Sequence, residues 1–95
     1  MKYERKKAIA LKYDQAKQLP PKVTASGQGI IAEEIIAKAK EYEVPIVEDA
    51  SLAALLAELN INETIPEELF EAVAEVFAFI YRLDQQANQV HKRNT

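Results

Sequence analysis

Hydrophobic and polar residues alternate along the first part of the chain, and this alternation predicts two short strands. In residues 7–13, Ile9, Leu11 and Tyr13 occupy every second position. Side chains two residues apart lie on the same face of a strand, so these three predict one buried face. The segment "KVTAS", residues 22–26, predicts a second strand after a loop that ends in two prolines.

From residue 30 the apolar spacing changes to the helical period, and three helices are predicted, at residues 30–42, 50–59 and 66–85. Asp49 stands where its side chain would cap the second helix. The predicted apolar stripe of the first helix is Ile31, Ile35, Ala39 and Tyr42, with Ala32 and Ile36 beside it.

The last predicted helix has an unusually wide apolar face. Thr64 and Glu67 resemble a capping box at its start, and Pro66 suits a first helical turn. The apolar arc covers roughly 220° of the helix, which is more than one sheet would cover. Either the helix is wedged between neighbours, or part of the arc is reserved for a partner. The arc consists of Leu69, Phe70, Val73, Ala74, Val76, Phe77, Phe79, Ile80, Tyr81 and Leu83.

The segment "VPIVE", residues 44–48, is rich in β-branched residues and predicts a further strand. A strand, a helix and a strand in this order favour a βαβ unit or at least a mixed sheet. We therefore expect an α/β fold, a small mixed sheet of three to four short strands packed with three to four helices.

The composition provides few residues that could bind a metal or act in catalysis. The 95 residues include no cysteine and one histidine, His91, in a polar C-terminal segment, so no metal site and no cofactor is expected. The two glycines of "SGQGIIAEE" have no accompanying lysine, and acidic residues stand where a phosphate would bind. The serines have no histidine in an ordered segment to activate them. We expect that the protein is not an enzyme.

The net charge of −3 conceals an asymmetry. Residues 1–24 carry seven Lys/Arg against two acidic residues, residues 25–81 carry two Lys against twelve acidic residues, and residues 82–95 return to +2. The basic front either binds nucleic acid weakly or forms a solvated face that attracts the acidic part. We favour the second interpretation, because nucleic-acid-binding domains are usually basic overall. No apolar run is long enough to span a bilayer, and we expect a cytoplasmic protein.

Four segments resemble the cytoplasmic C-terminal domain of the FlhB/YscU family, the substrate-specificity switch of flagellar and injectisome type III export. They are "AIALKYD", "PPKVTASG", "VPIVEDASLAALL" and "IPEELFEAVAEVFAFIYRL". The resemblance implies an FlhB/YscU-like domain over residues 1–83, followed by a polar, frayed tail at residues 84–95.

In the family, an Asn-Pro-Thr-His motif that cleaves its own backbone precedes the first of these segments. The positions that correspond to it here are Tyr3, Glu4, Arg5 and Lys6, and no asparagine of the chain is followed by proline. The resemblance therefore implies that self-cleavage does not occur, and that the chain begins where the family's cleaved fragment begins.

The family is thought to hold a short apolar signal of its export substrates in a shallow patch. By resemblance, the patch includes Pro21, Ala74 and Phe77, which are apolar here. Near the start of the second helix, Ala50 and Ala54 stand where the family often has proline and arginine, so any contact made by that arginine is lost.

The resemblance implies a non-catalytic binding module whose partners are type III export substrates and export-gate proteins. Such a module would be cytoplasmic, or peripheral to the membrane export apparatus. Because residues 1–6 are too short to supply the family's preceding strand, an open sheet edge would accept a strand from a partner or a second copy. Alternatively, the charged residues 4–7 guard that edge. An interaction domain unrelated to export is the remaining alternative.

Overall fold

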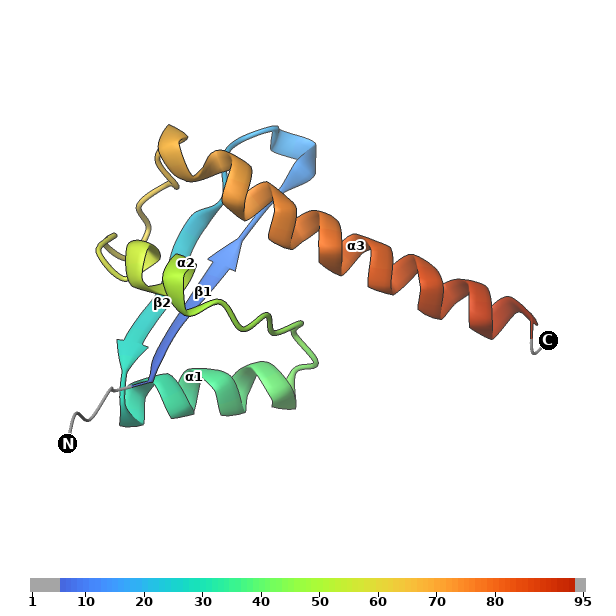
Figure 1. The fold of residues 1–95 in the computed structure, drawn as a ribbon, viewed down its shortest axis with the longest axis horizontal. Helices are drawn as coiled ribbons and strands as arrows, with labels where there is room; N and C mark the ends of the chain where they lie inside the picture. The colour runs from blue at the N-terminus through green and yellow to red at the C-terminus, as the bar shows by residue number, and fades with distance from the viewer. Residues whose placement is uncertain (1–5, 94–95) are drawn as a thin grey trace.

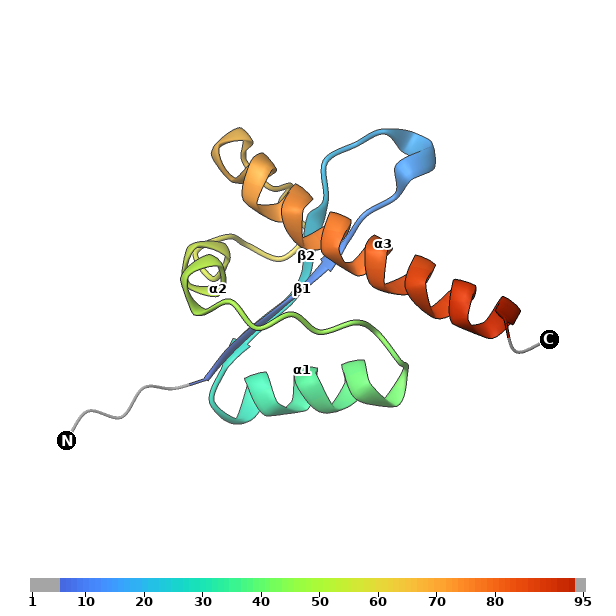
Figure 2. The same cartoon turned by 45° about the vertical axis from the view of Figure 1, so that its right-hand side comes forward.

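The computed structural model describes the backbone of residues 6–93, and their side chains except those of Gln15 and residues 84–93. Along the chain, the elements are β1 (Lys7–Lys12), η1 (Gln15–Lys17), β2 (Lys22–Gln28), α1 (Ile30–Glu41), α2 (Ala50–Leu56), η2 (Glu67–Leu69) and α3 (Phe70–Arg93). Helix α1 lies at one end of the β1–β2 hairpin, α3 crosses it near the other end, and α2 lies between them (Figures 1 and 2). The α/β class is confirmed.

The sheet is smaller than predicted. Strands β1 and β2 form an antiparallel pair with an irregularity between Ala10 and Leu11. In the described part of the chain, the only further pairing is an isolated bridge between Lys22 and Thr64. The two predicted strands at the front are therefore confirmed, whereas the prediction of a mixed sheet of three to four strands is wrong.

The predicted strand at residues 44–48 does not form. These residues have no regular secondary structure, and Val44, Ile46 and Val47 are exposed. β-Branched residues favour a strand only where a neighbouring strand pairs with them, and no described strand lies in register beside this segment. The sequence indicates the strand propensity of residues 44–48, but it does not indicate whether a neighbouring strand is present to pair with them.

Helix α1 packs on the hairpin through small residues. Ala32 is fully buried, whereas Ile31 and Tyr42, which the sequence placed on the buried stripe, are 51% and 70% exposed. Gly27 on β2 touches the side chain of Ile31: a Cβ at Gly27 would lie 2.7 Å from Ile31 Cβ and closer still to its Cγ2. The close approach of the two backbones therefore brings Ala32 inward and leaves the larger residues at the margin.

Helix α2 is shorter than predicted, and its predicted cap is confirmed. The Leu52 N–H donates a hydrogen bond of 3.0 Å to Asp49 Oδ1, satisfying one of the free donors of the first turn. The helix ends at Leu56, and Ala57 follows as its C-cap. The side chains of Leu52 and Leu56 form the buried face of α2, which packs in one cluster with Val23 of β2.

The last helix begins differently from the prediction. Pro66 precedes a short 3-10 turn, η2, and no side-chain cap bonds form there, so the predicted capping box of Thr64 and Glu67 is wrong. Thr64 instead takes part in the bridge with Lys22. Helix α3 continues to Arg93, beyond the predicted end, and the frayed character of residues 84–95 remains a prediction.

The buried core lies where α2, the segment before η2 and α3 meet β2. Val23 is completely buried at its centre, and Val73 and Ile65 are each 2% exposed. The remaining buried members are Leu52 and Leu56, against which Ile9, Leu11, Leu59, Leu69, Val76 and Phe77 pack in part. The core therefore fixes the first half of α3 over the end of the hairpin at which the loop joins β1 to β2.

Candidate apolar docking groove

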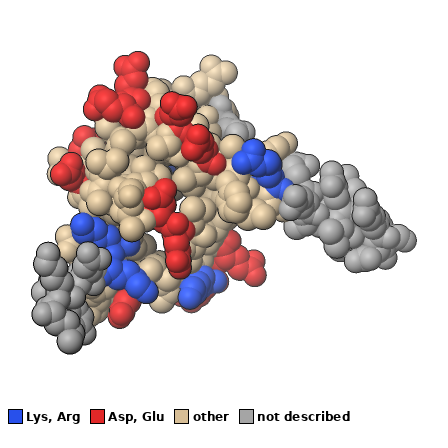
Figure 3. Space-filling view, in the orientation of Figure 1, with Lys and Arg blue, Asp and Glu red and all other residues tan. Residues whose placement is uncertain are grey.

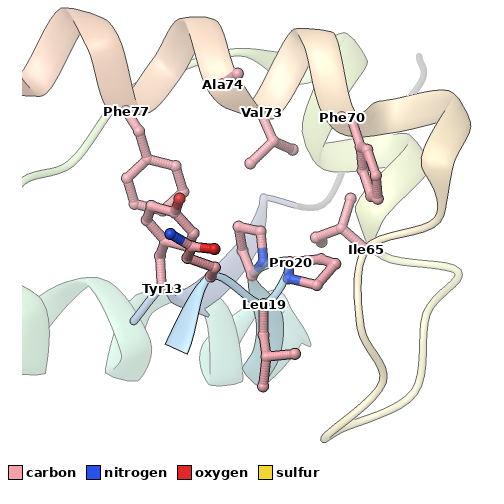
Figure 4. A pocket seen from close by; sticks show the side chains of 10 residues that line it. Tyr13, Leu19, Pro20, Ile65, Phe70, Val73, Ala74 and Phe77 are labelled. Atoms are coloured by element: carbon pink, nitrogen blue, oxygen red, sulfur yellow. The ribbon is translucent and has the colours of Figure 1, made fainter. Parts of the chain in front are cut away.

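An apolar groove lies between α3 and the loop that joins β1 to β2, with a volume of about 340 Å³. Figure 4 shows α3 along one side and the loop along the other. We call it the α3 groove. Its lining residues are Tyr13, Gln18, Leu19, Pro20, Pro21, Ile65, Phe70, Val73, Ala74 and Phe77.

The three patch residues expected from the family resemblance all line this groove. Pro21 stands just before β2, and Ala74 and Phe77 lie one turn apart on α3. Pro21 is far from the other two in the sequence, and the packing of α3 over the loop brings all three to one surface. Their role in binding remains a prediction.

The floor of the groove is built from the core and is therefore rigid. Ile65 and Val73 are almost completely buried, so substitutions there would disturb the fold as well as the groove. The Ile65 N–H donates a 2.8 Å hydrogen bond to the Pro21 carbonyl, and this bond holds the proline loop against the segment before η2.

The rim of the groove carries large apolar side chains that face solvent. Tyr13 is 42% exposed, Leu19 58% and Phe70 42%, and Ala74 is also exposed. Tyr13 and Phe77 contact across one end, with ring centroids 5.4 Å apart. A cluster of exposed apolar groups around a rigid floor is the usual form of a peptide or ligand site.

Among the residues that the structure describes, none that lines the groove is charged. Acidic side chains instead cover the neighbouring surface over α2 and the beginning of α3 (Figure 3). The groove would therefore select an apolar segment, and charged residues of a ligand would have to lie outside it. In the described part of the chain, no group of three or more His, Cys, Asp or Glu side chains could hold a metal ion.

Sequence reasoning missed several lining residues. Tyr13 was assigned to a buried strand face, Leu19 to an unremarkable loop, and Ile65 to a turn. Leu19 offered no clear signal in the sequence, because single exposed apolar residues are common on protein surfaces. The contribution of Ile65 depends on the Pro21 hydrogen bond, which no local pattern reveals.

The positions that correspond to the cleavage motif do not belong to this groove. Tyr3, Glu4 and Arg5 lie outside the described residues. Lys6 is exposed, and its carbonyl accepts a 2.8 Å hydrogen bond from the Gly29 N–H, which continues the hairpin by one pair.

Comparison with known proteins identifies the family. The model of the FlhB HrpN YscU SpaS family matches residues 5–80, and the chain belongs to this family. It is 49% identical over 80 residues to the Bacillus subtilis (strain 168) protein YlqH, covering 84% of this chain and 86% of that protein.

The flagellar biosynthetic protein FlhB of Bacillus subtilis (strain 168) is 41% identical over 83% of this chain, which spans 22% of FlhB. The matched part is about four fifths of this chain. It covers roughly a fifth of the length of each FlhB relative.

Solved structures confirm the fold. The cytoplasmic domain of FlhB from Shewanella putrefaciens matches 87% of this chain and 65% of that one, with a TM-score of 0.81 and 37% identity. The C-terminal domain of PscU matches 78% of this chain and 95% of that one, with a TM-score of 0.72 and 31% identity. None of the described helices is both long and apolar enough to cross a membrane.

Proposed function

We propose that this protein is a non-catalytic docking module that binds an apolar segment of a type III export substrate, or of an export-gate protein, in the α3 groove. The observation that carries the proposal is the convergence of Pro21, Ala74 and Phe77 on one uncharged groove with exposed apolar residues at its rim. Membership of the FlhB family supports the choice of partner.

The groove suits a short segment with a few apolar side chains. Its volume of about 340 Å³ is at the lower end of the range of ligand sites. On the α3 side, Val73 lies between Phe70 and Phe77, and the small Ala74 lies beside it (Figure 4). A ligand with apolar residues one helical turn apart, or every second residue in an extended form, would match this spacing.

The second part of the proposal is that the protein binds its partner without cleaving its own backbone. No asparagine of the chain precedes a proline, so the backbone arrangement of the family's self-cleavage is lacking in this sequence. The protein would then act by capture and release alone, in the cytoplasm or at the membrane export apparatus.

The test is binding of purified hook-type and rod-type export substrates to the protein by calorimetry. Ala74→Asp places a charge in the groove and should weaken binding at least tenfold, a change of about 1.4 kcal/mol. Ala72→Asp is the matched control, because Ala72 is exposed on the same helix but does not line the groove. Equal affinities for the two variants would refute the groove as the docking site.

A further inference from the structure

The two ends of the α3 groove differ in charge. Phe70, the first residue of α3, stands at one end, and Phe77 stands at the other, where its ring contacts Tyr13 (Figure 4). Exposed carboxylates follow one another along η2 and the first turns of α3, the segment that carries the Phe70 end. They are Glu67, Glu68, Glu71 and Glu75.

Two of these carboxylates lie beside the groove on its solvent side. Successive residues of an α-helix are about 100° apart. Relative to Ala74, which lines the groove and is exposed, the buried Val73 lies about 100° to one side. Glu71 lies about 60° and Glu75 about 100° to the other side. Both glutamates therefore flank the groove where a bound segment would meet solvent.

Stabilisation of the helix accounts for this charge only in part. Carboxylates in the first turn interact favourably with the helix dipole. However, Glu71 and Glu75 are four residues apart in α3, where like charges are neighbours and oppose helix formation, and Glu67 stands four residues before Glu71. No Lys or Arg stands three or four residues from any of the three. An excess of negative charge therefore remains beside the groove.

The nearest lysines of the hairpin do not offset this charge. Lys22 adjoins Val23 in β2, and adjacent residues of a strand point to opposite faces. Val23 is buried in the core with Val73 of α3, so Lys22 points to the other face of the hairpin. Lys12 is opposite Lys22 in the register and lies on that same face.

The Phe77 end of the groove lacks the acidic excess. Asp14 and Lys17 follow Tyr13 in the loop, and Arg82 follows Phe77 on α3, so one negative charge stands against two positive ones. Asp14 Oδ1 also accepts a 3.0 Å hydrogen bond from the Ala16 N–H. The groove is therefore acidic at its Phe70 end alone.

We propose that the apolar segment that docks in the α3 groove carries Lys or Arg residues at one end, and that this end lies beside Glu71 and Glu75. The inference rests on the proposed function, because it specifies the ligand of the same groove. The apolar side chains of the ligand would supply affinity, and the complementary charges would select among apolar segments and fix their orientation. A segment flanked by Asp or Glu would meet like charges and bind more weakly.

An array of short overlapping peptides from hook-type and rod-type export substrates tests the inference. The bound peptides should combine apolar residues with Lys or Arg at one end, and Ala74→Asp should abolish their binding. If Ala74→Asp abolishes binding but the bound peptides show no excess of Lys or Arg, groove docking stands and the present inference is overturned. If no peptide binds, or Ala74→Asp has no effect, the proposed function fails as well.

Fluorescence anisotropy of the most tightly bound peptide then tests which carboxylates act. Replacement of its terminal Lys or Arg residues by Glu should weaken binding by about tenfold at low salt, and by less at high salt, where exposed charges are screened. The double substitution Glu71→Gln and Glu75→Gln should remove most of this difference. Glu33→Gln with Glu34→Gln is the matched control, because it removes the same charge from the first turns of α1. Equal effects of the two double variants would overturn the inference.

Discussion

The rings of Tyr13 and Phe77 lie with their centroids 5.4 Å apart and their planes at 43°. Tyr13 follows β1, and Phe77 lies two turns into α3, so this contact joins the hairpin to the helix at one end of the α3 groove (Figure 4). A tilted aromatic pair at this distance has the geometry that stabilises such contacts. The groove is therefore closed at this end by the same contact that helps to hold α3 in place.

This contact predicts a measurable coupling energy. Phe77→Ala should lower the free energy of unfolding by about 2 kcal/mol, less than for a fully buried phenylalanine. A double-mutant cycle with Tyr13→Ala should give a coupling of about 1 kcal/mol in urea unfolding. Strictly additive effects of the two substitutions would mean that the rings do not stabilise each other.

An exposed residue at the rim of the α3 groove should contribute to binding but not to folding. Leu19 is 58% exposed, so Leu19→Ser should change the free energy of unfolding by less than about 0.5 kcal/mol. The same substitution should weaken binding of an export substrate several-fold, because it removes apolar area from the groove. Leu55→Ser is a suitable control, since Leu55 is 50% exposed on α2 and does not line the groove. If both variants bind as the unmodified protein does, Leu19 takes no part in docking.

The close approach of β2 and α1 predicts a steric penalty. Gly27→Ala should lower the free energy of unfolding by about 1–3 kcal/mol, because the new Cβ would overlap the side chain of Ile31. In an Ile31→Ala background part of this loss should disappear, since the overlap with Ile31 Cγ2 is gone while the Cβ contact remains. Thermal unfolding of the four proteins measures the effect. An unchanged loss in the Ile31→Ala background would show that the overlap with Cγ2 is not the cause.

The cap of α2 predicts a local loss of stability. Asp49→Ala removes the acceptor of the Leu52 N–H and should lower the free energy of unfolding by about 1 kcal/mol. Asp49→Asn keeps an acceptor oxygen and should change the free energy by only a few tenths of that amount. Chemical denaturation distinguishes the two variants, and an equal loss for both would show that the carboxylate charge, rather than the hydrogen bond, stabilises the helix.

Some local signals in the sequence were reliable, although the capping box of Thr64 and Glu67 was not. The alternation around Ile9 and Leu11 correctly predicted β1, and Asp49 correctly predicted the start of α2. The segment 44–48 was predicted wrongly, because a strand needs a partner that may come from anywhere in the chain and none lies beside it here. The wide arc of α3 was read correctly as unusual, but the sequence left open whether neighbours cover it. The structure shows that they cover only part of it: Val73 is buried, whereas Phe70, Phe79, Tyr81 and Leu83 remain exposed.

By itself, therefore, the sequence determined the helical and strand periods, the α2 cap and the wide apolar arc of α3, all of which depend on residues a few positions apart. Resemblance to a family added Pro21, Ala74 and Phe77 as candidate site residues. Only the tertiary structure decided that these three share one groove with Tyr13 and Leu19, and that part of the α3 arc stays exposed. Both results follow from the packing of α3 on the hairpin, a contact between distant segments that no local pattern encodes.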